Sequence, residues 1–469
     1  MFDKFVLIFF YFFLVSRFLS EKIGFLPKEV DLINFPFATL LIFFLIIRIG
    51  VKTRHKKFTI EEKKIYKVLF IFVLFAVLSM IVNYDIIFLP ASILFFLGFL
   101  EGPILFIALS HLVSRKDKFI LQVKKLFISL FWLNVFIVLF IDLPMFIITG
   151  NPDLISGSYG NNTYQFSMLL LIMGGLLFGE NYLTRRKFVI VFITQLLILF
   201  IFYLSQFRSG LPFFLLAYVV MISLLYGKRI VRAVLLYSLI MIVFMFLLSF
   251  LIKRDYVFGN LKYDDLIVLL SHPEEATEFG KIQAYFFSAE MFKDNPHLFL
   301  FGVGPGGYLS RANYTFSTEI ATAIYRQKGV ANIIRNTFGI SEPYTNDFIR
   351  RYRGRISNEM FYGSYQLSNP QSSYLSLITE IGLIGGVFFI SLYFYLLKKS
   401  IEYFRIIKEH STEYIPISIA LVGSIVYLLG LAFLDNYWEM ARVTLPVWLL
   451  FWTVANKSNI ILDEKLNVK

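Results

Sequence analysis

The chain has 469 residues, of which 58% are hydrophobic, and its mean hydropathy is +0.70. Soluble domains are only roughly 45–50% apolar, so the composition excludes an ordinary water-soluble fold. The chain has no cysteine, which excludes disulfides, thiolate metal ligands and cysteine nucleophiles. Its formal net charge of +13 would suit nucleic acid in a soluble protein, but in a membrane protein basic residues also mark cytoplasmic loops.

Apolar segments recur along the chain, and about twelve of them approach the roughly 20 residues that a helix needs to cross the hydrocarbon core. They lie near residues 5–19, 33–50, 66–83, 87–111, 126–149, 164–180, 188–205, 210–227, 232–252, 373–397, 413–434 and 440–456. The first follows Lys4 without a small-residue cleavage site after it, so we expect a retained helix. The sequence therefore predicts an all-α integral membrane protein with about 12 transmembrane helices.

Basic residues concentrate in alternate connections between these segments. They are dense at 48–67 and 115–125 and sparse in the connections on the other side. Since cytoplasmic loops carry the excess of Lys and Arg, we predict that both termini face the cytoplasm and that the protein lies in the cytoplasmic membrane. The positive charge is then a topology signal, and we expect no nucleic-acid partner.

One long polar stretch interrupts the apolar pattern and is predicted to be extracytoplasmic. It divides the chain into an N-terminal membrane bundle at 1–252, a mainly helical extracytoplasmic loop domain at 253–372, C-terminal spans at 373–456 and a cytoplasmic tail at 457–469. No internal repeat pairs the early spans with the late ones, as many transporters would show.

Arg208 lies in a short predicted extracytoplasmic turn, just before Gly210 and Pro212. A guanidinium binds phosphate in a bidentate manner, and the free N–H groups of a helix N-terminus attract anions. Gly210 lets the backbone approach a ligand closely. This combination suits a lipid diphosphate at headgroup depth, and the alternative is an interfacial arginine whose side chain extends to water.

A second candidate region leads from the loop domain into the tenth predicted span. At 100° per residue, Ser373, Ser376 and Glu380 fall on one helix face, which predicts a polar stripe that points into the bundle. Within a helix Gln371 would lie opposite Glu380, so the two share a site only if the helix starts after Gln371. An intramembrane carboxylate is a functional candidate by default, and a hydrogen bond that fixes helix packing is the alternative.

The stretch from Phe301 to Tyr308 is rich in glycine, but it lacks the Lys-Ser/Thr of a P-loop and the βαβ setting of a dinucleotide fold. We predict a tight turn that lets the loop domain lie against the membrane. Arginines of the loop domain near aromatic residues suit phosphate and sugar rings, and solvated surface is the alternative. Only His272 and His297 of the five histidines fall in this domain, so we predict no histidine-based metal site.

Three motifs resemble the O-antigen polymerase and O-antigen ligase superfamily, which also includes capsule and exopolysaccharide polymerases. Arg208-Ser209-Gly210 is similar to the family's Ser-Arg-Ser/Gly signature. Residues 281–306 are similar to its pattern of Arg, then Pro, then Gly-x-Gly. Residues 370–385 are similar to its His-Asn-x-x-Leu element with a downstream Glu-x-Gly-x-x-Gly. The architecture resembles the family over most of the chain.

The sequence departs from the family at two positions. Gln371 stands where the ligases have a histidine, the proposed base, and glutamine cannot take a proton. Lys281 stands where arginine is usual, which keeps the charge but loses the planar fork. Both departures favour a polymerase over a ligase.

The resemblance implies a GT-C-like membrane glycosyltransferase that extends a surface polysaccharide from oligosaccharides linked to polyprenyl diphosphate, such as undecaprenyl diphosphate, and needs no cofactor. The expected catalytic residues are Arg208, Glu380 and Gln371. The expected substrate-binding residues are Lys281, Arg311, Arg355, Ser373 and Tyr374. Candidates for the base are Glu380, Glu359 and Asp347.

The expected partners are the lipid-linked substrates and the bilayer, with a flippase and a chain-length regulator as further candidates. Three alternatives stay open at this point. One is a ligase-type glycan transferase, and another is a 12-helix transporter of polysaccharide or lipid, since about twelve spans with both termini inside is a common transporter layout. The third is a binding or sensor protein without chemistry, in which Arg208 would be dispensable.

Overall fold

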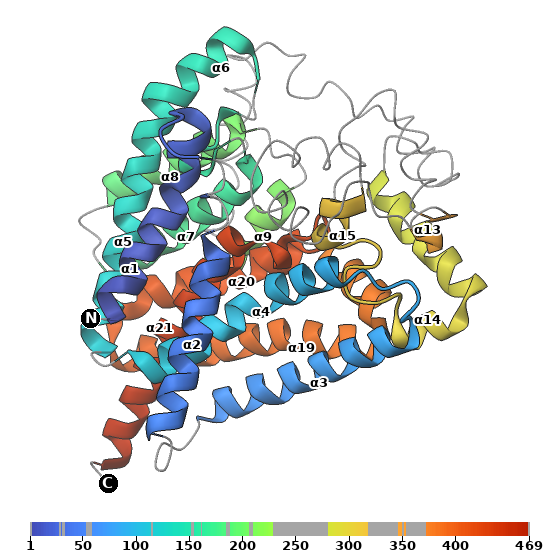
Figure 1. Ribbon diagram of the computed structural model, residues 1–469. Coiled ribbons are helices and arrows are strands. Elements are labelled where there is room, and N and C mark those ends of the chain that lie inside the picture. The colour runs from blue at the N-terminus through green and yellow to red at the C-terminus, as the bar shows by residue number, and fades with distance from the viewer. Residues whose placement is uncertain are drawn as a thin grey trace.

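The computed structural model describes residues 2–27, 30, 33–52, 59–113, 116–151, 154–160, 162–183, 188–205, 210–227, 280–317, 346–348, 351–352 and 372–467. Within these residues the secondary structure is helical and contains no β-strand, as the sequence predicts (Figure 1). The predicted loop domain is described only in its α13–α15 region and two short pieces near residue 350.

The described residues form a series of α-helices. They are α1 (Phe2–Arg17), α2 (Asn34–Lys52), α3 (Ile60–Val82), α4 (Leu89–Leu112), α5 (Lys116–Ile137), α6 (Leu143–Thr149), α7 (Thr163–Leu183), α8 (Phe188–Leu204), α9 (Leu211–Tyr226), α13 (Gly280–Asp294), α14 (Pro296–Phe301), α15 (Arg311–Ser317), α19 (Ser373–His410), α20 (Ile415–Leu431) and α21 (Ala441–Asn467). Short π-helical turns extend α1 at Phe18–Lys22 and join α5 to α6 at Val138–Asp142.

Among the described residues, 6 helices are long and apolar enough to cross a membrane. They are Ile60–Val82, Leu89–Leu112, Asp117–Thr149, Thr163–Leu183, Ser373–His410 and Thr412–Leu431. Every apolar segment that the sequence predicts coincides with a helix, except the one at 232–252, which lies outside the described residues. The total of about twelve spans stays a prediction.

Close packing around α20 forms the centre of the helix bundle. A Cβ atom on Gly175 of α7 would lie 2.5 Å from Cα of Ala420, and one on Gly179 would lie 2.3 Å from Cα of Pro416. Glycines at such positions let two backbones approach closely, as is common where membrane helices pack. The helix α20 is consequently almost wholly buried.

The helices α3, α4 and α19 run alongside one another, and α13, α14 and α15 gather at one end of them, away from both termini (Figure 1). A second, smaller hydrophobic core holds this end together. Its buried members are Ala284, Met291, Leu298, Val303, Tyr308, Leu309, Tyr352 and Leu375. Leu375 belongs to α19, so the core joins the α13–α15 region to the first turn of a membrane helix.

The helix α19 is interrupted at Gly382, which has φ of 79° and ψ of 168°. This left-handed region is open to glycine and unfavourable for other residues. Space is also lacking, because a Cβ atom at Gly382 would lie 1.9 Å from the carbonyl oxygen of Leu300 in α14. The kink therefore depends on a residue without a side chain.

We predict that Gly382→Ala destabilises the protein by about 3 kcal/mol or more, since it adds an overpacking penalty to the cost of a left-handed alanine. The measurement is thermal unfolding in detergent. Gly227→Ala is the matched control, because Gly227 also has positive φ, 58°, but a Cβ atom there would meet no described atom within 4 Å. Equal stability losses in the two variants would contradict the close approach of α14 to α19.

Candidate functional site

The segment from residue 302 to residue 310, here called the glycine-rich turn, follows α14 and lies between α4 and α19. Gly302, Gly304 and Gly306 all have positive φ. A Cβ atom on Gly306 would lie 2.5 Å from the carbonyl carbon of Ala91 in α4, and one on Gly302 would lie 2.4 Å from that of Glu380 in α19. The segment is thus a tight turn against two apolar helices, as the sequence predicts.

The side chain of Glu380 binds this turn. Its carboxylate accepts hydrogen bonds from the backbone N–H of Gly306 at 2.6 Å, of Tyr308 at 3.1 Å and of Ser310 at 2.6 Å. Glu380 is fully buried. A buried carboxylate is tolerated when hydrogen bonds replace its hydration, and here backbone groups of the turn supply them.

The kink at Gly382 supplies further contacts between α19 and the turn. The carbonyl of Thr379 accepts from the N–H of Val303 at 2.8 Å, and the carbonyl of Glu380 accepts from the N–H of Gly304 at 2.9 Å. The hydroxyl of Ser79 in α3 also donates to the Glu380 carbonyl, at 3.0 Å. The interruption therefore leaves helix carbonyls available, and the turn satisfies them.

Arg311 follows the turn directly and begins α15. Its Nη2 lies 3.1 and 3.2 Å from the two carboxylate oxygens of Asp435, and its Nε donates to the carbonyl of Asn436 at 3.1 Å. Both acceptors belong to the connection between α20 and α21. The side chain of Arg311 is about one-third exposed, so it is paired with Asp435 but not buried.

Glu439 completes a charged cluster, which we define as Arg311, Glu380, Asp435 and Glu439. One of its carboxylate oxygens accepts from the N–H of Ala312 at 3.3 Å, and the other accepts from the amide of Asn436 at 2.6 Å. Burial raises the pKa of Glu439 well above its ordinary value, the Glu380 carboxylate raises it further, and Arg311 acts in the opposite direction. The cluster is thus rich in carboxylates around one arginine.

The first turn of α19 fits against the same connection. The hydroxyl of Ser373 accepts from the N–H of Trp438 at 3.1 Å, and that of Ser376 accepts from the amide of Asn436 at 3.0 Å. Tyr374 donates to the carbonyl of Leu429 at 2.8 Å. Ser373, Ser376 and Glu380 are all completely buried, which confirms that this polar helix face points into the bundle.

Four of the predicted site residues are thereby brought to one end of the bundle: Arg311, Ser373, Tyr374 and Glu380. Arg208, Gln371 and Arg355 lie outside the described residues, as does the candidate base Glu359. Lys281 is in the first turn of α13, but its side chain is not described. For these residues the sequence-based roles stay predictions.

Sequence reasoning did not single out Asp435, Asn436 or Glu439. The available signal was a pair of acidic residues in a short connection between the last two apolar segments. Such a connection is an unfavourable place for charge unless the charge is paired or used. Pairing with a partner more than a hundred residues away, however, has no local signature.

The helix composition and a family match together define the class of this protein. Residues 192–390 match the model of a family described as O-antigen ligase. The matched stretch begins in α8, ends within α19 and includes the glycine-rich turn, Arg311 and Glu380. With its long apolar helices, the chain is a multi-pass membrane protein.

Residues 192–390 belong to the O-antigen polymerase and ligase superfamily. Its members are membrane enzymes of the glycosyltransferase type that process O-antigen glycans. No curated protein that was compared with the chain matches it.

We predict that Glu380→Gln releases the glycine-rich turn, because an amide nitrogen cannot accept a hydrogen bond from a backbone N–H. The native chain lacks cysteine, so a single Val303→Cys, at a fully buried position, reports the release by maleimide labelling. Losing charge-assisted hydrogen bonds worth about 1.5–3 kcal/mol should raise the labelling rate at least ~10-fold. Glu409→Gln, at the exposed far end of α19, is the control, and equal rates in both variants would contradict the anchoring role.

The raised pKa of Glu439 predicts a pH-dependent stability. The folded state holds the proton more tightly than the unfolded state, so this contribution is fully present below about pH 4.3 and is lost as pH rises through the folded-state pKa, by at most ~1.4 kcal/mol per pH unit. Glu439→Gln should therefore match the wild type at pH 5 and exceed its unfolding temperature at pH 8. Glu464→Gln, at an exposed position, is the control, and its unfolding temperature should vary with pH as that of the wild type does. The same pH dependence in Glu439→Gln would refute the assignment.

Proposed function

We propose that this protein is a GT-C-like glycosyltransferase of the cytoplasmic membrane that polymerises oligosaccharide repeat units carried on polyprenyl diphosphate. The product is a surface polysaccharide of the O-antigen, capsule or exopolysaccharide type. The α13–α15 end faces the outside, in line with the basic residues of the opposite connections. A flippase delivers the substrates to this face, and a chain-length regulator sets the polymer length.

One observation carries the proposal. The segment that matches the O-antigen ligase family contains the glycine-rich turn, Arg311 and Glu380, which converge in space on the acidic connection between α20 and α21. Intramembrane and interfacial charges are unfavourable unless they are used. Their concentration at the end predicted to be extracytoplasmic supports a reaction on lipid-linked glycans there.

In the proposed reaction, a hydroxyl oxygen of one repeat unit forms a bond to the anomeric carbon of another. The bond between that carbon and the diphosphate oxygen breaks, and the polyprenyl diphosphate leaves with the electron pair. The hydroxyl proton passes to a carboxylate of the enzyme. The diphosphate already activates the donor sugar, so the reaction needs no nucleotide.

Arginines and a lysine stabilise the charge that grows on the leaving diphosphate. Arg208 is the main candidate, assisted by Lys281 or Arg311, since preorganised cations at a developing charge supply a large part of catalysis. Arg311 is held in place by Asp435 and by the carbonyl of Asn436, so it needs little reorganisation to meet an anion. Its partial exposure leaves it accessible to a diphosphate.

The remaining predicted residues bind and orient the glycan. Arg355, Ser373 and Tyr374 contribute to substrate binding, and Gln371 forms a hydrogen bond to the acceptor hydroxyl, since an amide cannot remove its proton. Ser373 and Tyr374 already hydrogen-bond to the backbone around the α20–α21 connection. Their contribution is therefore to fix the wall of the site.

The described carboxylates differ in their suitability as the base. Glu380 is fully buried, and its two carboxylate oxygens accept hydrogen bonds from three backbone N–H groups of the turn, so neither oxygen is available to remove a proton from an acceptor hydroxyl. We therefore assign Glu380 to positioning the turn. Glu439 is partly buried and has a raised pKa, which brings a carboxylate closer to the range that suits a general base near neutral pH. Glu359 and Glu439 are therefore the candidates for the base, whereas Asp347 lines a separate cavity beside the end of α3 and is not assigned to this step.

A ligase is the second candidate function, because the matched family is described as O-antigen ligase. The chemistry at the donor is the same in both cases, and only the acceptor differs. Gln371 in place of the ligases' histidine favours the polymerase. Purified protein given only its host strain's lipid-linked repeat unit forms oligomers if it is a polymerase, whereas a ligase leaves the repeat unit unextended until its own acceptor is added.

We predict that Arg208→Ala lowers the polymerisation rate by about 10²–10³-fold, the effect typical of removing one preorganised donor from a charge-stabilising site. Arg208→Lys should retain part of the rate, because it keeps the charge but loses the bidentate fork. The readouts are glycan chain length in cells and oligomer formation from the lipid-linked repeat unit. Arg405→Ala, at the exposed far end of α19, is the control; unchanged chain length in Arg208→Ala at normal protein levels would exclude the catalytic role.

A further inference from the structure

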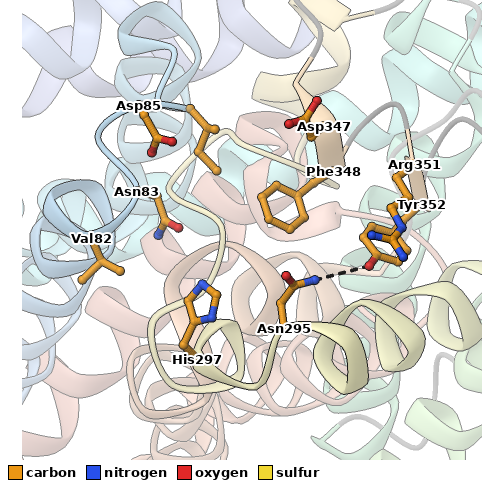
Figure 2. Close-up of a pocket in the computed structure, with 10 residues that line it drawn as sticks. Val82, Asn83, Asp85, Asn295, His297, Asp347, Phe348, Arg351 and Tyr352 are labelled. Atoms are coloured by element: carbon orange, nitrogen blue, oxygen red, sulfur yellow. Dashed lines mark hydrogen bonds between the residues drawn. The ribbon is translucent and has the colours of Figure 1, made fainter.

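A cavity of about 410 Å³ opens between the end of α3, the junction of α13 with α14, and the short pieces 347–348 and 351–352. Ten residues line it: Val82, Asn83, Asp85, Ile86, Asn295, His297, Asp347, Phe348, Arg351 and Tyr352. Its volume falls within the range of about 300–1,000 Å³ that is typical of small-ligand sites. Figure 2 shows polar side chains from three separate segments around one space, with the Phe348 ring among them.

One side of the cavity is built around Asp294. Its Oδ2 accepts from the hydroxyl of Tyr352 at 2.8 Å and from Nη2 of Arg351 at 3.2 Å. The amide of Asn295 donates to the same tyrosine hydroxyl at 3.3 Å, as the dashed line in Figure 2 marks. The Tyr352 ring stacks with Phe348 at a centroid distance of 6.3 Å. Side chains from two segments are therefore joined in this wall, and the charge of Arg351 is already paired.

The lining also includes groups that no described residue engages. Asp85 and Asp347 form no hydrogen bond or ion pair with another described residue, and both are exposed residues of the cavity lining. His297 also lines the cavity, next to Asn295 and away from the two aspartates (Figure 2). Two such carboxylates accept hydrogen bonds from hydroxyl or amino groups, and they repel a phosphate or diphosphate.

The cavity is also joined to the glycine-rich turn. Asn83 lines it, and its amide donates to the carbonyl of Gly302 at 2.9 Å and to that of Ser79 at 2.8 Å. Gly302 begins the turn that binds Glu380 and leads to Arg311. The glycine-rich turn therefore connects the cavity to the charged cluster.

We infer that this cavity is a glycan subsite that binds an uncharged or amino-bearing sugar ring of the repeat unit. The inference rests on the proposed function and specifies where the glycan, as opposed to the diphosphate, is bound. The carboxylates of Asp85 and Asp347 accept hydrogen bonds from the sugar's hydroxyl or amino groups, and Phe348 packs against the apolar C–H face of the ring. A sugar ring has many hydroxyl groups and one apolar face, and the mixed polar and aromatic lining of the cavity matches both.

The probe for binding is the water-soluble oligosaccharide released by mild acid from the host strain's lipid-linked repeat unit. Purified full-length protein in detergent should bind it saturably. Asp85→Asn and Asp347→Asn should each weaken binding about tenfold, the effect of losing one hydrogen bond to a charged acceptor. Asp463→Asn, which alters an exposed aspartate near the end of α21, should bind as the wild type does.

Kinetics with the intact lipid-linked repeat unit separate binding from chemistry. Both cavity variants should raise KM about tenfold and leave kcat within about twofold, because they remove binding that is the same in ground and transition states. Inhibition by polyprenyl diphosphate without sugar should be unchanged, since the cavity does not bind the diphosphate.

Two results would overturn the subsite while leaving the polymerase assignment intact: wild-type protein that forms oligomers but does not bind the released glycan, or variants with unchanged glycan affinity and KM. Conversely, saturable glycan binding that both variants weaken, in a protein that forms no oligomers, would support the subsite and refute the polymerase.

Discussion

Three backbone N–H groups of the glycine-rich turn converge on one buried carboxylate, that of Glu380, and the arrangement of the whole charged cluster depends on this contact. Each side needs the other. A carboxylate without hydration is costly unless hydrogen bonds replace the water, and buried N–H groups without partners are costly as well. Because Arg311 follows the turn directly, the contact also fixes where α15 begins and where the arginine can reach.

The kink of α19 satisfies the same constraint from the backbone side. A continuous helix would use its own carbonyls, whereas the interruption at Gly382 leaves those of Thr379 and Glu380 available for the turn. Ser79 of α3 then donates a hydrogen bond to the kink, and Asn83, directly after α3, donates one to the turn. Side chain and backbone of one glutamate thus hold the α14–α15 connection against the membrane helices, which explains why glycine occurs on both sides of the contact.

How far the sequence predicts this structure depends on the range of each interaction. Helices such as α4 and α20 follow from local apolar composition, and the buried face of Ser373, Ser376 and Glu380 follows from helical periodicity, so both could be predicted. The pairing of Arg311 with Asp435 joins residues 124 positions apart and leaves no local pattern. The kink at Gly382 was equally hidden, because a glycine within an apolar helix is usually tolerated without a break.

The distribution of charge separates two chemical tasks on one stretch of backbone. At the end of the glycine-rich turn, Arg311 presents a partly exposed cation that Asp435 and Asn436 hold in position, which suits a developing anion. At its beginning, the cavity beside Asn83 has two carboxylates that no described residue engages, and it suits hydroxyl-rich, uncharged groups. A lipid-linked sugar has both features in covalent sequence, an anionic diphosphate followed by neutral rings. In the proposed reaction the turn therefore sets the spacing between the two, and its rigidity, which derives from Glu380, determines how accurately the anomeric carbon is placed between them.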